Sequence, residues 1–125
     1  MLDQLEEVLA RHEVDISVTR GISLAVSEAF TNALLHGNKA DPGKEVILSL
    51  EVNESEVTAD IIDQGSGGEE RIRGKQPAKP MDEGGRGIDL IRHYAASLKI
   101  REHANGGLQV TIVFSRQSKQ RVTHT

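Results

Sequence analysis

Residues 27–37 of this chain read SEAFTNALLHG, and this stretch decides how the chain folds. Polar side chains recur at every fourth position, at Glu28, Asn32 and His36, and Gly37 follows. Residues four apart lie on one face of a helix, and glycine is common directly after a helix ends. Apolar residues of the same segment fall together on one face: Ile22, Val26, Ala29, Phe30 and Ala33. The pattern predicts an amphipathic helix with a polar stripe beside its core face.

This helix is expected to begin at Thr19 or Ser23 and to end near His36. A glutamate at the margin of a core can orient or deprotonate a hydroxyl or a water. The amide oxygen of Asn32 suits Mg²⁺, which takes most of its ligands from phosphates and water. The simpler interpretation is a polar helix edge facing solvent, with His36 as a capping or packed residue. Taken alone, the stripe favours this simpler interpretation.

A second motif, DQGSG, follows a predicted hairpin. Apolar residues alternate with others over 45–52 and again over 57–61, so residues 45–62 are expected to form two paired strands. Asp63 at the strand end could accept a hydrogen bond from the amine of adenine. Gly65 and Gly67 would let the backbone approach the base. The alternative is an ordinary aspartate-glycine turn, which for this motif alone is the better interpretation.

A third motif, GGRGI, opens a predicted helix over about 86–95. Gly84, Gly85 and Gly87 would expose backbone N–H groups at a helix N-terminus, where anions such as phosphates bind. Arg86 could add a charge-assisted contact, and Ile88 begins the apolar face of the helix. A flexible loop before a capped helix explains the motif about equally well.

The remaining segments outline a single domain over residues 1–114. Helical spacing predicts a first helix over 2–11, and residues 98–114 read as a second hairpin. Residues 68–83 are rich in glycine, proline and charge, and we favour a functional lid over a linker between domains. The polar tail 115–125 is expected to be disordered.

Composition excludes several classes of protein. The chain has 125 residues, a formal net charge of -4 and no cysteine, so it has no disulfide and no basic footprint for direct nucleic-acid binding. No apolar run approaches the roughly 20 residues that span a bilayer. With three aromatic residues the core must be aliphatic. These features indicate a cytoplasmic protein without membrane contact.

Taken in order, the three motifs resemble the ATP-binding boxes of the GHKL ATPase superfamily, which includes gyrase and the histidine kinases. The amino-acid sequence of residues 27–37 is most similar to that of the bacterial anti-sigma factor serine/threonine kinases. The resemblance implies an α/β sandwich of the Bergerat type, with a mixed, mostly antiparallel sheet and helices on one face. The family pattern also begins with a strand before the first helix, and none is evident in this sequence.

The resemblance implies a role for each motif residue, with ATP and Mg²⁺ as cofactors. Glu28 would be the general base, Asn32 would hold magnesium, and Asp63 would contact adenine. The other residues expected to bind nucleotide are His36, Gly65, Gly67, Gly84, Gly85, Arg86, Gly87 and Ile88. Residues 68–83 would form the ATP lid.

The implied activity is ATP-dependent phosphorylation of a STAS-domain anti-anti-sigma protein by a kinase that also binds a sigma factor. The resemblance further implies a homodimer. The apolar stripe of residues 2–11 would suit a dimer contact, or would simply pack on the sheet. Two alternatives stay open: a non-catalytic ATP-sensing binding module, and the detached ATPase domain of a two-component histidine kinase.

Overall fold

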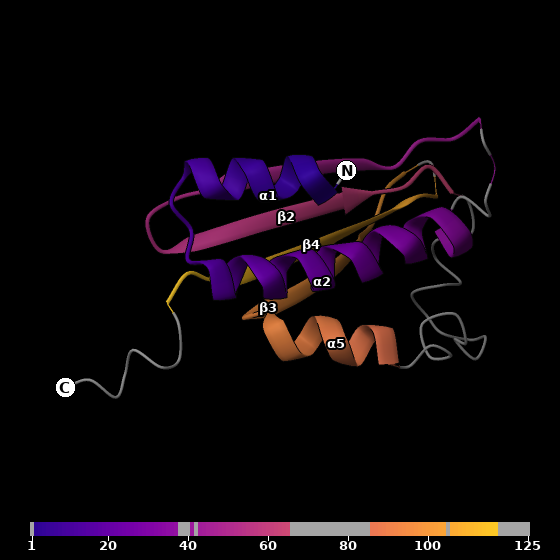
Figure 1. The fold of residues 1–125 in the computed structure, drawn as a ribbon. Coiled ribbons are helices and arrows are strands. Elements are labelled where there is room, and N and C mark those ends of the chain that lie inside the picture. Colours follow the sequence, from indigo (N-terminus) through magenta and orange to yellow (C-terminus); the bar gives the residue numbers. More distant parts are fainter. Residues whose placement is uncertain (1, 38–40, 42, 66–85, 105, 118–125) are drawn as a thin grey trace.

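The computed structural model describes residues 2–37, 41, 43–65, 86–104 and 106–117. Three α-helices, one π-helical turn and four strands follow one another along the chain in these residues (Figure 1). They are α1 (Leu2–Arg11), α2 (Ile16–Asn32), η1 (Ala33–Gly37), β1 (Ile47–Val52), β2 (Glu56–Ile62), α5 (Arg86–Tyr94), β3 (Ser97–Glu102) and β4 (Leu108–Ser115).

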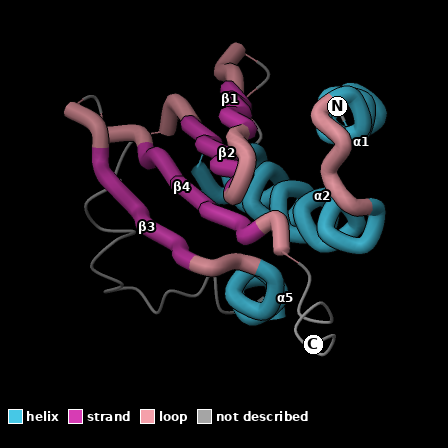
Figure 2. The backbone as a smooth tube through the Cα atoms, turned by 90° about the vertical axis from the view of Figure 1, so that its left-hand side faces the viewer, coloured by secondary structure: helices cyan, strands magenta, loops and turns pink. Residues whose placement is uncertain are grey.

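The four strands form one sheet in the order β1-β2-β4-β3, and each neighbouring pair is antiparallel. All three α-helices lie on the same side of this sheet (Figure 2). The architecture confirms the predicted α/β sandwich with helices on one face. Both hairpins are confirmed, although β1 begins at Ile47 rather than at residue 45. Among the described residues, no helix is long and apolar enough to cross a membrane.

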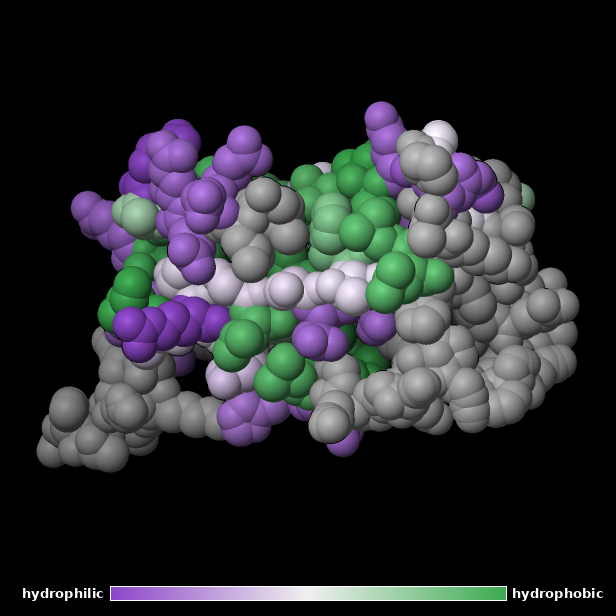
Figure 3. Space-filling model, turned by 45° about the vertical axis from the view of Figure 1, so that its right-hand side comes forward, coloured by the Kyte–Doolittle hydropathy of each residue, from purple (hydrophilic) through white to green (hydrophobic). Residues whose placement is uncertain are grey.

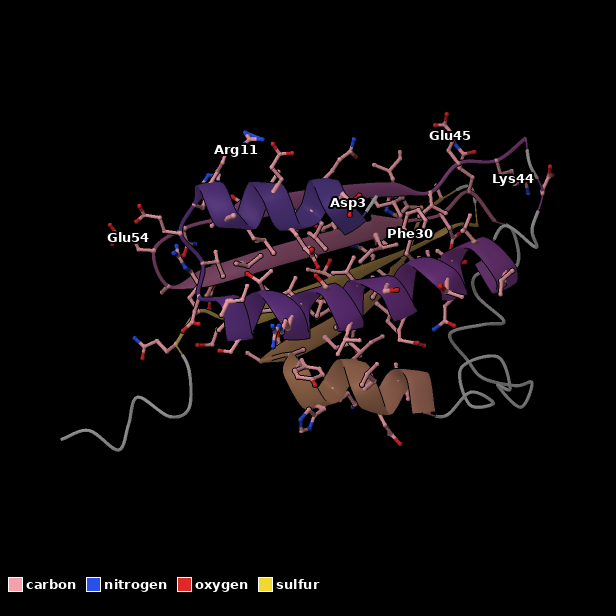
Figure 4. The ribbon with its side chains drawn as sticks, viewed as in Figure 1. Asp3, Arg11, Phe30, Lys44, Glu45 and Glu54 are labelled. Carbon is pink, nitrogen blue, oxygen red and sulfur yellow. The ribbon has the colours of Figure 1, made fainter. Side chains whose placement is uncertain are left out.

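The core lies between the sheet and the helices, because alternate residues of each strand point toward the helices. Most inner positions of the two central strands, β2 and β4, are fully or almost fully buried: Val57, Ala59, Ile61, Leu108, Ile112 and Phe114. From the predicted apolar face, α2 supplies Ile22, Val26 and Ala29 and η1 supplies Ala33, all buried. Phe30 lies on the side of α2 that faces the sheet and is half-buried (Figure 4). The predicted helix face is therefore confirmed.

Helix α1 packs into this core. Leu5 and Leu9 are 2% and 0% exposed, and the Ser23 hydroxyl of α2 donates a hydrogen bond to the Glu6 carboxylate at 3.1 Å. The apolar stripe of residues 2–11 therefore packs against the core of the same domain. Of the two explanations offered by the sequence, packing against the rest of the domain is the one that the structure supports.

Helix α2 begins earlier than the sequence predicted. Asp15 is its N-cap, and the carboxylate accepts a hydrogen bond from the Ser17 backbone N–H at 3.1 Å. The two residues predicted as possible starts, Thr19 and Ser23, are 6% and 8% exposed within the helix. Both are good capping residues in isolation. The prediction was wrong because both residues are buried inside a helix that Asp15 already caps.

A single arginine holds the far end of β4 against two loops. The Arg116 guanidinium donates to the backbone oxygens of Asn53, in the β1–β2 turn, and of His12, just beyond α1. The Arg116 N–H also donates to the Ser55 oxygen at 2.9 Å. Ser115 and Arg116, expected to belong to a frayed tail, are therefore fixed in place; residues 118–125 lie outside the described part.

Helix α5 packs closely on α2 through a glycine. A Cβ atom built on Gly21 would lie 2.5 Å from Cδ1 of Tyr94, far inside van der Waals contact. Gly21 is buried in the middle of α2, whereas Tyr94 is 38% exposed at the end of α5. The absence of a side chain at Gly21 therefore sets how closely the two helices approach.

The substitution Gly21→Ala tests this contact. In the parent chain we expect it to destabilise the fold by about 1–3 kcal/mol, because the Tyr94 ring must move. In a Tyr94→Ala background the sign should reverse, since alanine in a helix interior is favoured over glycine by about 1 kcal/mol. Urea unfolding of the four variants measures both changes. Equal effects of Gly21→Ala in the two backgrounds would contradict the contact.

Candidate functional site

Several predicted site residues gather at one end of the molecule. The strand register places the start of β1, the end of β2 and the start of β4 side by side, since Ile62 pairs with both Ile47 and Gln109. The C-terminal end of α2 and the N-terminal end of α5 lie at the same end (Figure 1). The β1–β2 turn, marked by Glu54, lies at the opposite end from Lys44 and Glu45 (Figure 4). We refer to the end that holds Asp63 as the site end.

Asp63 occupies a position where a core side chain would be expected. It continues the inward alternation of Ala59 and Ile61 by one further step, and it is only 4% exposed. Its Oδ1 accepts hydrogen bonds from the backbone N–H groups of Gly65 at 3.0 Å and Leu108 at 3.1 Å. A buried carboxylate needs such donors to offset its desolvation. This one is therefore held rigidly on the helix-facing side of the sheet.

The loop after Asp63 is tied to the neighbouring strand. The Gln64 side-chain oxygen accepts a hydrogen bond from the Glu45 backbone N–H at 2.9 Å, just before β1. Gly65 is buried, and its N–H is one of the two donors to Asp63. These contacts fix the start of the glycine motif. Gly67, which the sequence also placed in this motif, lies outside the described residues.

Glu28 and Asn32 both lie in the last part of α2 and are half-buried, as expected for the margin of a core. The helix changes from α to π at Ala33, whose N–H bonds to the oxygens of both Ala29 and Phe30. Short π-helical segments are rare and often occur at functional sites. The π-helical turn begins directly after Asn32, within the span of the three-residue stripe that the sequence predicted for an α-helix.

His36 belongs to this π-helical turn, which ends at Gly37 as the sequence predicted for the helix end. The orientation of the His36 side chain lies outside what the structure describes.

The structure describes only part of the third motif, GGRGI. Helix α5 begins at Arg86, and Gly87 and Ile88 form its first turn, so the predicted helix start is confirmed. Ile88 is half-buried and packs against the core. Gly84, Gly85 and the segment 68–83, predicted to be the ATP lid, lie outside the described residues.

The site end also has apolar surface that sequence analysis did not single out. Ile100 of β3 belongs to the helix-facing row with Val110 yet remains 41% exposed. Figure 3, which brings this end forward, shows hydrophobic surface in green reaching the exterior. Leu34 and Leu35 of η1 contribute further exposed apolar side chains, whereas Ile47 is exposed on the side of the sheet that points away from the helices. An apolar surface beside one buried carboxylate is typical of small-molecule sites.

No group of three or more His, Asp or Glu side chains in the described part could hold a metal ion. Magnesium commonly has few protein ligands, with the remainder from phosphates and water. The amide oxygen of Asn32 fits a site of this kind.

A model of the histidine kinase-like ATPase domain matches residues 1–114. The chain belongs to this family. Its relatives include the anti-sigma F factor of Clostridium perfringens strain SM101, which is 30% identical over 106 residues, 82% of this chain and 76% of the relative. The anti-sigma F factor of Anoxybacillus flavithermus is 31% identical over 96 residues, 74% of this chain and 66% of the relative.

Unfolding measurements test the hydrogen bonds of the buried Asp63 carboxylate in this histidine kinase-like ATPase domain. Asp63→Ala leaves two backbone N–H groups without their acceptor and should cost about 1–3 kcal/mol of stability. Asp63→Asn keeps a carbonyl oxygen in the accepting position, so the loss should be smaller. Urea denaturation compares both variants with Glu54→Ala, an exposed turn substitution expected to change stability by less than about 0.5 kcal/mol. Equal stability of Asp63→Ala and the control would contradict the assigned hydrogen bonds.

Proposed function

We propose that this chain binds Mg-ATP at the site end and transfers the terminal phosphoryl group to a serine or threonine of a protein partner. The observation that carries the proposal is Asp63: a carboxylate that is 4% exposed and is held by two backbone N–H groups, at the end of the molecule that also carries exposed apolar side chains. A carboxylate has acceptor capacity beyond two hydrogen bonds. It can therefore also accept one from the exocyclic amine of adenine.

Phosphates would bind at the N-terminal end of α5. Backbone N–H groups point outward there, and the helix dipole favours anions. The end of β2, which Asp63 directly follows, and the N-terminal end of α5 lie at the same end of the molecule (Figure 1). We assign base binding to Asp63 and Gly65, and phosphate binding to Arg86 and Gly87. Gly67, Gly84 and Gly85 are assigned to the same binding from sequence alone.

In the reaction we propose, the partner hydroxyl attacks the γ-phosphorus of ATP, its proton passes to Glu28, and ADP leaves. Glu28 is half-buried in α2, one helical turn before Asn32, so both side chains can face the same phosphate group. Asn32 would hold the magnesium ion. When bound, magnesium supplies positive charge that offsets the charge on the phosphates.

The partners that we propose follow from the relatives. Those proteins are named anti-sigma F factors. We therefore propose that this chain sequesters a sigma factor in the cytoplasm and phosphorylates a STAS-domain anti-anti-sigma protein. A non-catalytic ATP-sensing module is the competing function. Both functions need the nucleotide site, but only the kinase needs a carboxylate at Glu28.

Nucleotide binding is tested by thermal unfolding with and without Mg-ATP. At a concentration of a hundred times its dissociation constant, the nucleotide should add about 2.7 kcal/mol of stability. Asp63→Asn replaces an acceptor oxygen with a donor amide and should weaken binding about 10- to 100-fold. The absence of stabilisation in the parent chain would refute the site.

Catalysis is tested separately with Glu28→Gln, which keeps the shape of the side chain but cannot accept a proton. We expect nucleotide-dependent stabilisation to persist while phosphoryl transfer to a co-expressed STAS-domain protein falls by about 100-fold or more. Glu54→Gln, at the opposite end of the molecule, is the matched control and should transfer normally. If the parent chain binds nucleotide but transfers nothing, the binding-module function is the correct one.

A further inference from the structure

The turn that joins β3 to β4 carries one of the donors to the buried carboxylate. It contains Gly106, whose φ of 95° lies in the left-handed region that favours glycine, and Gly107 follows. Glycine restricts the backbone less than any other residue, so the sequence alone leaves several orientations open to the peptide unit between Gly107 and Leu108. The N–H of this peptide unit donates to Asp63 at 3.1 Å. Its orientation therefore matters for the proposed nucleotide site.

The backbone of His103 holds this peptide unit from the other side. The His103 N–H donates to the Gly107 oxygen at 2.8 Å, and the His103 oxygen accepts from the Gly106 N–H at 2.9 Å. The Gly107 oxygen and the Leu108 N–H belong to one planar trans peptide unit, so they point in opposite directions. A hydrogen bond at the oxygen therefore directs the N–H toward Asp63. Hydrogen bonds that are linked in this way also polarise and strengthen each other.

The His103 side chain is anchored on the face of the sheet that points away from the helices, which we call the outer face. Its Nε2 lies 2.8 Å from the side-chain oxygen of Gln109, and the Gln109 amide donates to the Asp60 carboxylate at 2.9 Å. A carboxylate accepts hydrogen bonds and donates none, so it fixes which way the Gln109 amide points. The amide oxygen then faces His103, and Nε2 carries the proton that it donates. The Thr111 hydroxyl gives Asp60 a further donor.

These hydrogen bonds close into a ring around the end of β2. On the helix-facing side, the ring runs from Asp63 through the Leu108 N–H to the β3–β4 turn. On the outer face, it runs from His103 through Gln109 to Asp60. The chain itself completes the ring, because Asp60 precedes Asp63 by three residues. The ring thus connects β2, β4 and the turn after β3, which are neighbours in the sheet (Figure 2).

We propose that His103 is a positioning residue for base recognition. Through the ring it holds the Leu108 N–H, and with it the Asp63 carboxylate, in the orientation that accepts a hydrogen bond from the adenine amine. This role rests on the proposed function, because it concerns the base at Asp63. The His103 side chain lies on the outer face, whereas Asp63 is buried on the helix-facing side, so the effect passes through the ring. The phosphates are assigned to the N-terminal end of α5, away from the ring, so their binding should not depend on His103.

Amide hydrogen exchange without nucleotide tests the ring itself. His103→Leu removes the side-chain donor, and we expect the Leu108 N–H to exchange about tenfold faster or more. The N–H of Ile112, a fully buried residue in the middle of β4, should keep its parent rate. His103→Gln places an amide N–H close to the position of Nε2 and should restore the parent rate at Leu108. Gln109→Leu breaks the ring at its next bond, should act like His103→Leu, and carries the same test if that variant does not fold.

Nucleotide preference tests the consequence for the site. The probe is purine riboside triphosphate, which has a hydrogen in place of the exocyclic amine of ATP. We expect the parent chain to bind ATP about tenfold or more tightly than this analogue. His103→Leu should reduce that ratio about fivefold and leave the affinity for the analogue within about twofold of the parent value. His103→Gln should keep the parent ratio.

His12→Leu is the matched control. It is the same substitution at an exposed histidine, and His12 lies at the opposite end of the molecule, beside Arg116 and the β1–β2 turn. This variant should bind both nucleotides like the parent chain.

The possible outcomes separate the role of His103 from the proposed function. A parent chain that binds ATP and the analogue equally would overturn base recognition by Asp63, and the role of His103 with it. If the parent prefers ATP, unchanged Leu108 exchange or an unchanged ratio in His103→Leu would overturn the role of His103 alone. Faster exchange at both Leu108 and Ile112, or an equal loss of affinity for both nucleotides, would indicate a general structural effect and also overturn it. So would a His103→Gln chain that behaves like His103→Leu.

Discussion

The alternation of side chains across the sheet is the constraint on which the rest of this structure depends. Residues at odd positions of β2, such as Ala59 and Ile61, point to the helices, while Asp60 points the other way. A shift of one residue in the pairing would exchange the two faces completely. The core, the buried carboxylate and the charged outer face are all consequences of the same register.

Asp63 shows how that constraint produces a site. It extends the inward alternation past the last apolar residue of β2, so a carboxylate is buried where the sheet ends. The acceptor is stabilised by the Leu108 N–H of the adjacent strand β4, and Gly65 supplies a second donor. Because both donors are backbone groups, one in the central strand β4 and one in the loop after β2, the carboxylate is positioned before any ligand arrives. Such preorganisation lowers the entropic cost of binding.

Much of this arrangement could be predicted from the sequence. Period-two patterns located both hairpins, and the polar spacing of residues 27–37 located the helix that carries Glu28 and Asn32. Asp63 was recognised because it directly follows a strand. In each case the signal is local, within one element or at its end, so no knowledge of the pairing between distant segments was needed.

The rest depends on contacts between distant segments. Leu108 lies 45 residues from the carboxylate to which it donates, so its role follows only from the β2–β4 pairing. Asp15 was missed as a cap because Thr19 and Ser23 are equally good capping residues; burial of their hydroxyls excludes them. The π-helical turn after Asn32 has no sequence signature that we recognised.

Strand order is the clearest case of information absent from local patterns. Two hairpins can form one sheet in several strand orders. In this structure β4 lies between β2 and β3. That choice places β1 and β3 at the two edges, which separates Glu51 from Lys99 by the full width of the sheet. Had β3 paired with β2, the basic strand would lie beside the acidic residues of its own chain. The charges would then tend to pair within one molecule, so the connectivity of the sheet is what keeps its acidic and basic edges apart.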